Sequence, residues 1–344
     1  MTRYRFTSIN KAGYTLAEVM IASALVAIII PILTLVFTAT NKGFTGFEAK
    51  NSIKQVNQNT VNRMYLRLGR NKRLFENTSA DNPFLARAST STCPIPITGS
   101  KLPVIEENGT LAEGTTNYHS ESFGNMLFFA YNDSSIDLTV KETSSSTSSF
   151  RIDLYKFGLY YLTQDNASNI LGKSTSKVVE WGSIKYANCQ QITNITNSTK
   201  KSSTIAALSD SGILMCWDPS ATSPSVAFSS VTKTGTDTGT LTLQASHKIP
   251  MDSYKVLTQI TTGLMGGGYQ YGVSPNTSGW ADVRKEVPAY ATESGLFPGG
   301  LEIGIAGPSG GRKVLIRSVI MARGSMQSII VDEQIIIACA RDIW

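Results

Sequence analysis

A long apolar stretch lies near the start of the sequence. Residues 14–37 are almost wholly hydrophobic, whereas residues 1–13 carry three basic side chains and no acidic one. As a helix this stretch measures roughly 36 Å, enough to cross a bilayer. It is longer than the apolar part of a cleavable secretory signal, which holds about 7 to 15 residues. The pattern predicts a transmembrane helix whose basic flank stays on the cytoplasmic side.

Beyond Phe37 the hydrophobic positions recur at helical spacing with polar residues between them. The recurring residues are Phe44, Phe47, Ile53, Val56, Val61, Met64 and Leu68. We therefore expect one helix to continue to about Leu68, giving roughly 55 residues and about 80 Å of helix. Pro31 predicts a kink because it removes a backbone hydrogen bond, and Gly43 and Gly46 predict a bend.

The rest of the chain alternates short β-rich runs with turn residues. The runs cover residues 125–131, 150–162, 177–186, 212–217, 240–243, 254–260, 313–321 and 328–338. Residues 150–157 alternate as a half-buried strand does, and 312–320 resemble the second arm of a hairpin. No helical crossover is visible between the runs, which favours antiparallel pairing. We expect an α+β fold, with a long N-terminal helix packed on a mainly antiparallel β head.

Four segments follow from this pattern. They are the basic residues 1–13, which the resemblance described below implies are a leader peptide, 14–37 as a membrane-spanning helix, 38–75 as its amphipathic continuation and 76–344 as the head. Three stretches rich in Ser, Thr and Asn, at 143–149, 193–204 and 219–239, are expected to be surface loops.

Composition supports a folded chain and gives little support to nucleic-acid binding. The 344 residues are 41% hydrophobic and 16% charged, with a net charge of +6. Three of those positive charges lie in residues 1–13, so the remainder carries only +3. A basic run at the end of the helix is a candidate phosphate-binding stripe, although a solvated helix end is favoured. The run comprises Arg63, Arg67, Arg70, Lys72 and Arg73.

The four cysteines are widely spaced and match no zinc motif. In an exported chain an even number of cysteines favours two disulfides, and four cysteines allow three pairings. We expect Cys189 to pair with Cys216, and Cys93 with Cys339; four free thiols are the alternative.

Glu18 is the fifth residue of the apolar stretch that begins at Tyr14, and it interrupts that stretch with a charge. A charged side chain inside a membrane helix is costly, by about 2.5 to 3.5 kcal/mol on insertion scales, and such residues are usually functional. A cut between Gly13 and Tyr14 places Glu18 one helical turn from a new α-amino group. Its expected partner is therefore such an amine, either on its own chain or on a neighbouring subunit, where charge pairing sets the register.

Residues 11–22, KAGYTLAEVMIA, resemble the processing motif of type IV prepilins. The motif joins a short basic leader, a Gly, an aromatic residue, Thr-Leu, any residue and Glu with an apolar helix. The resemblance covers about the first 40 to 60 residues and implies that a prepilin peptidase cuts after Gly13 and N-methylates Tyr14. Glu18 then serves in assembly. Tyr14 replaces the commoner Phe, and Pro31 lies earlier than in many major pilins.

The resemblance implies a structural subunit of a type IV pilus or type II secretion filament, with no enzyme activity and no cofactor. The large head favours a minor pilin or a J-like pseudopilin, and Glu18 argues against a K-like one. Implied partners are the peptidase, other pilin or pseudopilin subunits, and indirectly the inner-membrane platform and its ATPase motor. The precursor is expected in the bacterial inner membrane with a cytoplasmic N-terminus, and the mature protein in a periplasmic or extracellular filament.

Other functions stay open at this stage. One is a tip adhesin or DNA-capturing pilin, and another is an anchored periplasmic protein that never polymerises. The sequence does not separate pilus, secretion and competence systems.

Catalytic and metal motifs are not apparent. The glycine-rich segments 266–268 and 307–311 lack a nucleotide fingerprint, and His119 and His247 have no evident partner. Calcium binding by scattered oxygens and glycosylation at Asn166 or Asn276 are left undecided.

Overall fold

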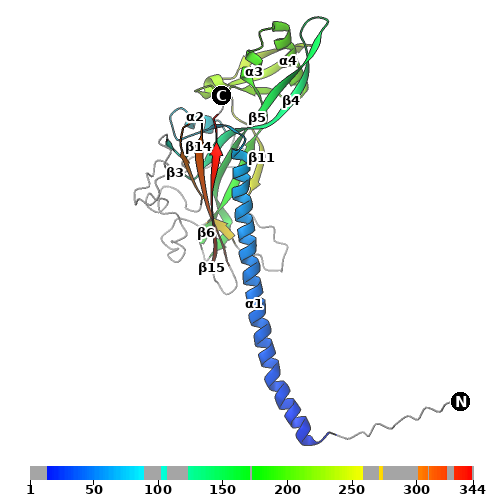
Figure 1. Cartoon of the computed structure of the whole chain (residues 1–344), viewed down its shortest axis with the longest axis vertical. Coiled ribbons are helices and arrows are strands. Elements are labelled where there is room, and N and C mark those ends of the chain that lie inside the picture. The colour runs from blue at the N-terminus through cyan, green and yellow to red at the C-terminus, as the bar shows by residue number, and fades with distance from the viewer. Residues whose placement is uncertain are drawn as a thin grey trace, which may run out of the picture. The chain divides into compact units, whose positions relative to one another are not determined.

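The computed structural model describes residues 14–88, 102–106, 123–170, 173–258, 271–273, 301–308, 310–323 and 329–342. The chain divides into two compact units, Met1–Glu48 and Ala49–Trp344. Helix α1, Leu16–Leu68, makes up nearly all of the described part of the first unit and continues into the second (Figure 1). The leader, residues 1–13, lies outside the described residues.

The last five turns of α1 form part of the head. From Ala49 onward its buried residues recur every three or four positions, as a helix with one face on a core requires. They are Ala49, Ile53, Asn57, Thr60, Val61, Met64 and Leu68. Of the predicted apolar stripe, Ile53, Val61, Met64 and Leu68 are buried here. The predicted end of the helix at Leu68 is confirmed.

Short strands and helices complete the head. The strands before α3 are β1 Asn71–Leu74, β2 Ile105–Glu106, β3 Phe123–Gly124, β4 Leu127–Lys141, β5 Thr147–Ile170, β6 Lys173–Ser183 and β7 Tyr186–Asn188. Those after it are β8 Met215–Trp217, β9 Phe228–Gly235, β10 Thr238–Leu243, β11 Met251–Val256, β12 Tyr271–Val273, β13 Leu301–Ala306, β14 Arg312–Arg323 and β15 Ile329–Ala340. The helices are α2 Asn82–Leu85, α3 Cys189–Thr193, α4 Ser198–Asp210 and α5 Pro224–Ala227.

Antiparallel pairing dominates the sheet. The long β4–β5 hairpin pairs with β6 through β5, and β14 pairs with both β13 and β15. Among the described strands only β7–β8 and β13–β2 pair in parallel. The expected α+β fold, a long helix packed on a mainly antiparallel head, is confirmed.

The central strands are buried on both faces. On one face, Leu127, Phe129 and Tyr160 pack against Val61, Met64 and Leu68 of α1. On the opposite face lies an aromatic core whose members include Phe75, Phe84, Phe128, Phe157, Trp181, Trp217 and Phe228. Two-sided burial explains why 127–131 reads as an unbroken apolar run instead of an alternating one.

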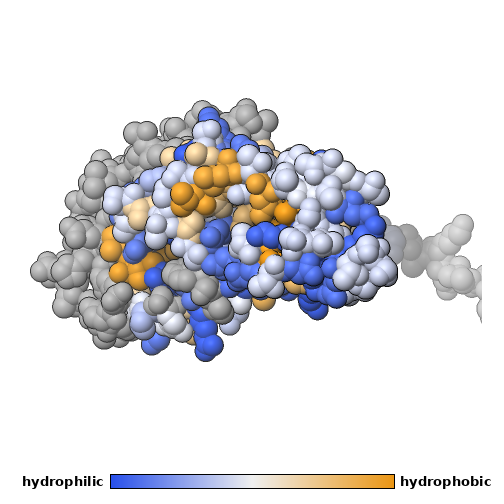
Figure 2. Space-filling model, turned by 90° about the horizontal axis from the view of Figure 1, so that it is seen from above, coloured by the Kyte–Doolittle hydropathy of each residue, from blue (hydrophilic) through white to orange (hydrophobic). Residues whose placement is uncertain are grey.

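A third core occupies the end of the head that carries the tip of the β4–β5 hairpin, α3 and α4 (Figure 1). There Ile152 and Leu154 of β5 pack with Ile205 and Leu208 of α4 and with Cys216. Only one face of the hairpin is covered here, so residues 150–154 alternate as predicted. Seen from above, hydrophobic and hydrophilic side chains alternate in patches over the head (Figure 2).

Two predicted loops are wrong. Residues 193–204 contain the start of α4, and 219–239 contain α5 and β9. Asn197 caps α4 by accepting the Lys200 N–H at 3.0 Å, and burial of Ile205 and Leu208 holds the helix in place despite its polar composition. The third predicted loop, 143–149, is shorter than expected because β5 begins at Thr147.

Candidate functional site

Hydrogen bonds that run in both directions between Thr15 and Glu18 cap the start of α1. The Thr15 backbone N–H donates to Glu18 Oε2 at 2.9 Å, and the Thr15 hydroxyl donates to the same oxygen at 3.1 Å. The Glu18 N–H lies 3.4 Å from Thr15 Oγ1. This is a capping box, which satisfies backbone donors that the first helical turn leaves unpaired. The spacing Thr-x-x-Glu carried this signal in the sequence.

The two predicted processing residues, Gly13 and Tyr14, come directly before this cap in the sequence. Tyr14 precedes the helix and is 87% exposed, whereas Gly13 lies outside the described residues. Both hydrogen bonds from Thr15 end on Glu18 Oε2, and Glu18 Oε1 has no hydrogen-bond partner among the described residues.

The apolar part of α1 is exposed on every side. One described helix, α1, is long and apolar enough to cross a membrane, and none of its apolar window is buried. Its hydroxyls turn back onto the helix: Ser23 donates to the Met20 carbonyl at 2.9 Å, and Thr34 to Ile30 at 2.8 Å. Such bonds leave no hydroxyl proton unpaired in an apolar surrounding.

Pro31 lies inside a helix that remains continuous from Leu16 to Leu68. The two glycines expected to mark a bend, Gly43 and Gly46, are also helical, and a Cβ on either would contact nothing. The structure gives no packing reason for these glycines, and the kink at Pro31 stays a prediction.

Polar contacts fix the second half of α1 on the sheet. Asn57 is fully buried and its Nδ2 donates to the carbonyls of Ser318 at 3.1 Å and Asp332 at 3.0 Å. Glu180 on β6 is 3% exposed and forms salt bridges with Arg63 and Arg67. A buried carboxylate needs such partners, because an unpaired one is costly. We call this set, Arg63, Arg67 and Glu180, the helix latch.

The residues of the predicted basic run therefore have different surroundings in the structure. Arg63 and Arg67 belong to the latch, and Arg73 is buried against Asp81, with its NH2 2.8 Å from Asp81 Oδ1. Arg70 is exposed at the end of α1. Burial lowers the pKa of Lys72. Sequence reasoning missed the latch because Glu180 lies 117 positions from Arg63.

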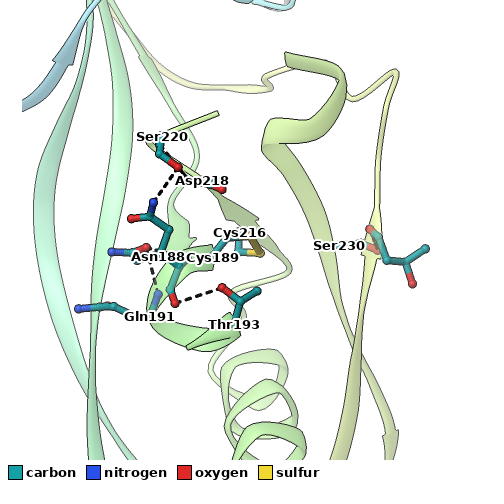
Figure 3. Close-up of a disulfide and its surroundings, with 10 residues drawn as sticks. Asn188, Cys189, Gln191, Thr193, Cys216, Asp218, Ser220 and Ser230 are labelled. Carbon is teal, nitrogen blue, oxygen red and sulfur yellow. Dashed lines mark hydrogen bonds between the residues drawn. A yellow bond between two sulfur atoms is a disulfide. The ribbon is translucent and has the colours of Figure 1, made fainter. Parts of the chain in front are cut away.

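One of the two predicted disulfides is confirmed. Cys189 opens α3 and bonds to Cys216 of β8, with Cα atoms 5.2 Å apart (Figure 3). Next to it, Asn188 caps α3 by accepting the Gln190 N–H at 3.0 Å.

The predicted Cys93–Cys339 disulfide involves a residue that the structure does not describe. Cys339 carries a free, exposed thiol, and Cys93 lies outside the described residues. The side chain of Cys339 lies on the exposed face of β15, on the same side as the exposed Ile337.

The remaining candidates show structural contacts. His247 Nε2 lies 3.0 Å from the hydroxyl of Tyr186, and burial lowers the pKa of His247. Gly307 has φ +99°, and the Gly311 N–H donates to the Pro308 carbonyl at 2.9 Å, so this segment forms a turn. Asn166 lies on β5, whereas His119, residues 266–268 and Asn276 lie outside the described part. Within the described part, no group of three His, Cys, Asp or Glu side chains is placed to hold a metal ion.

Comparison with known proteins adds no relative. No family model, curated protein or solved structure matches this chain.

Proposed function

We propose that this chain is a pilin-like subunit of a type IV pilus or type II secretion filament. A prepilin peptidase cuts it after Gly13, and the exposed apolar part of α1 then leaves the membrane to pack among the equivalent helices of other subunits. The large head supports a role as a minor pilin or J-like pseudopilin.

The observation that carries this proposal is an apolar helix with a single charge. Glu18 is the only charged side chain between Tyr14 and Asn41, and this whole segment is exposed. A helix that is hydrophobic all round must be covered by lipid or by other helices. A membrane alone would disfavour the carboxylate, whereas a bundle of subunits supplies it with a partner amine.

The capping box supports the assignment of that partner. Thr15 occupies only Oε2 of Glu18, which leaves Oε1 to accept from the α-amino group of Tyr14 in a neighbouring subunit. Misregistered subunits would leave both charges unpaired in an apolar core, so the pairing selects one axial stagger.

Processing is tested by mass and N-terminal sequence. The full chain is expressed in a bacterium with and without a prepilin peptidase, extracted from the membrane and analysed. We expect a chain that begins at N-methylated Tyr14 only when the peptidase is present. A chain that keeps Met1, or that is cut beyond Phe37, would refute the proposal.

The role of Glu18 is tested with a variant that keeps the cap. Glu18→Gln retains a side-chain acceptor at the third helical position, as capping boxes allow, but removes the charge. We expect Glu18→Gln and Glu18→Ala to be equally deficient in incorporation into filaments, whereas the control Glu48→Gln, at another acid of α1, incorporates normally. Normal incorporation of Glu18→Gln would show that the carboxylate serves only the cap.

A further inference from the structure

An open groove of about 550 Å³ runs along the exposed side of the last turns of α1. One wall consists of residues of α1 and of the turn after it: Asn59, Asn62, Arg63, Leu66, Arg67 and Arg70. Tyr131 and Asp133 of β4 form the opposite wall. We call it the arginine groove. All of its residues belong to the compact unit Ala49–Trp344.

Hydrogen-bond donors in the groove are only partly used. Arg63 binds Glu180 through Nε, and its side chain remains 40% exposed, so both terminal nitrogens are available. Arg67 donates from NH1 to the Tyr131 hydroxyl at 2.9 Å. Because Tyr131 accepts this bond, its own O–H proton is not used by Arg67, and Tyr131 lines the groove. Burial raises the pKa of Tyr131, so that proton is retained at neutral pH.

Arg70 gives the groove an uncommitted cation. Its side chain is exposed and makes no ion pair or hydrogen bond with any part of the chain that the structure describes. Arg63 lies on the last turns of α1, and Arg70 lies in the turn that follows Leu68; both line the groove. Their guanidinium groups can reach one bound group from two sides.

The groove carries an excess of positive charge. The three arginines face one carboxylate, Glu180, which lies buried beneath Arg63 and Arg67. Asp133 adds one negative charge to the wall, and it pairs at 3.2 Å with Lys185, which does not line the groove. The three arginines therefore exceed the two carboxylates by one positive charge, in a concave site that also offers a phenol and amide donors.

We propose that the arginine groove binds a phosphate group. Planar guanidinium donors match phosphate oxygens two at a time, and several donors converging from different directions suit a tetrahedral oxyanion better than a planar carboxylate. The bound phosphate is a free phosphate or a phosphodiester of nucleic acid. This site does not depend on filament assembly.

The test uses the full chain in a maltoside detergent, which contains no phosphorus. Inorganic phosphate is titrated and its ³¹P resonance is followed at constant ionic strength. We expect saturable broadening in the wild type and binding about tenfold weaker, or more, in Arg70→Gln, because one charge-assisted bond is lost. Arg151→Gln, an exposed arginine of β5 outside the groove, is the matched control and should bind as the wild type does.

Competition identifies the source of the phosphate. A single-stranded oligodeoxynucleotide that displaces inorganic phosphate, and whose binding is weakened by Arg70→Gln, assigns a nucleic-acid phosphodiester. Phosphate binding without oligonucleotide binding assigns a small phosphate. Absence of saturable binding of both probes, equal binding by Arg70→Gln and Arg151→Gln, or acetate competing as well as phosphate would overturn the proposal. None of these results bears on cleavage at Gly13, which is measured separately.

Discussion

In the helix latch, Arg63 and Arg67 both pair with the buried carboxylate of Glu180. We predict that either arginine alone can balance the charge of that carboxylate. We consider Arg63→Met, Arg67→Met and the double variant, since methionine keeps much of the side-chain length without the charge. Each single variant leaves Glu180 one cationic partner, whereas the double variant leaves a carboxylate that is 3% exposed with none.

The magnitudes follow from exposure. Arg63 is 40% exposed, so its loss should cost about 1 kcal/mol or less, as for surface ion pairs. Arg67 is 24% exposed and also loses its bond to Tyr131, which raises the cost to about 1–2 kcal/mol. An uncompensated buried charge costs about 3–5 kcal/mol, so the double variant should lose more than the two single variants together.

The assay is urea unfolding of the detergent-solubilised chain, followed by the fluorescence of the buried Trp181 and Trp217. Adding Glu180→Gln to the double variant should restore part of the lost stability, because the unpaired charge is then gone. Lys54→Met, exposed on α1, controls for removing a positive charge from this helix.

Two results would refute this reasoning. One is a double variant whose loss equals the sum of the single losses within about 0.5 kcal/mol, the usual limit of additivity. The other is a failure of Glu180→Gln to improve the double variant.

Three further predictions concern the head. Replacing both Cys189 and Cys216 by Ala should cost about 3–4 kcal/mol, since the disulfide closes a separation of 27 residues, and proteolysis should then cut around α3 first. Denaturation midpoints should show stability falling as the pH drops below about 6.5, since burial lowers the pKa of folded His247 and the unfolded chain binds the extra proton. In His247→Gln this pH dependence should be smaller, and an unchanged profile would contradict the assignment. Gly239→Ala should cost about 1–3 kcal/mol in urea, because its Cβ would lie 2.7 Å from Ile205 Cγ2 at the contact between β10 and α4; an unchanged midpoint would show that this contact yields freely.

The sequence predicted the elements whose cause is local. A periodic helix ending at Leu68 and the β-rich runs at 150–162 and 313–321 depend on spacing within the run itself, and all appear in the structure. Helix α4 was missed because its many Ser and Thr residues are poor helix formers, whereas its stability comes from burial against β4, β9 and β10.

The candidate site also combines local and long-range features. The cap at Thr15 and Glu18 depends on four adjacent residues, so the sequence alone could have predicted it, although we did not. Glu180 in the run 177–186 carried no such sign, because an acid between apolar residues acquires its meaning from arginines far away in the chain. Asn57 likewise resembled a solvent-facing helix position, yet it is fully buried against β14 and β15.

The contacts of Asn57 also constrain the order in which the protein folds. Its partners Ser318 and Asp332 lie 261 and 275 positions further along the chain. The part of the docking face around Ile53 and Asn57 therefore stays uncovered until nearly the whole polypeptide has been made, because its partners lie on β14 and β15. Contacts of such long range slow folding, because a large loop must close before they form. A truncation before β14 would leave this part of the helix without its partners, although Val61, Met64 and Leu68 could still pack against β4 and β5.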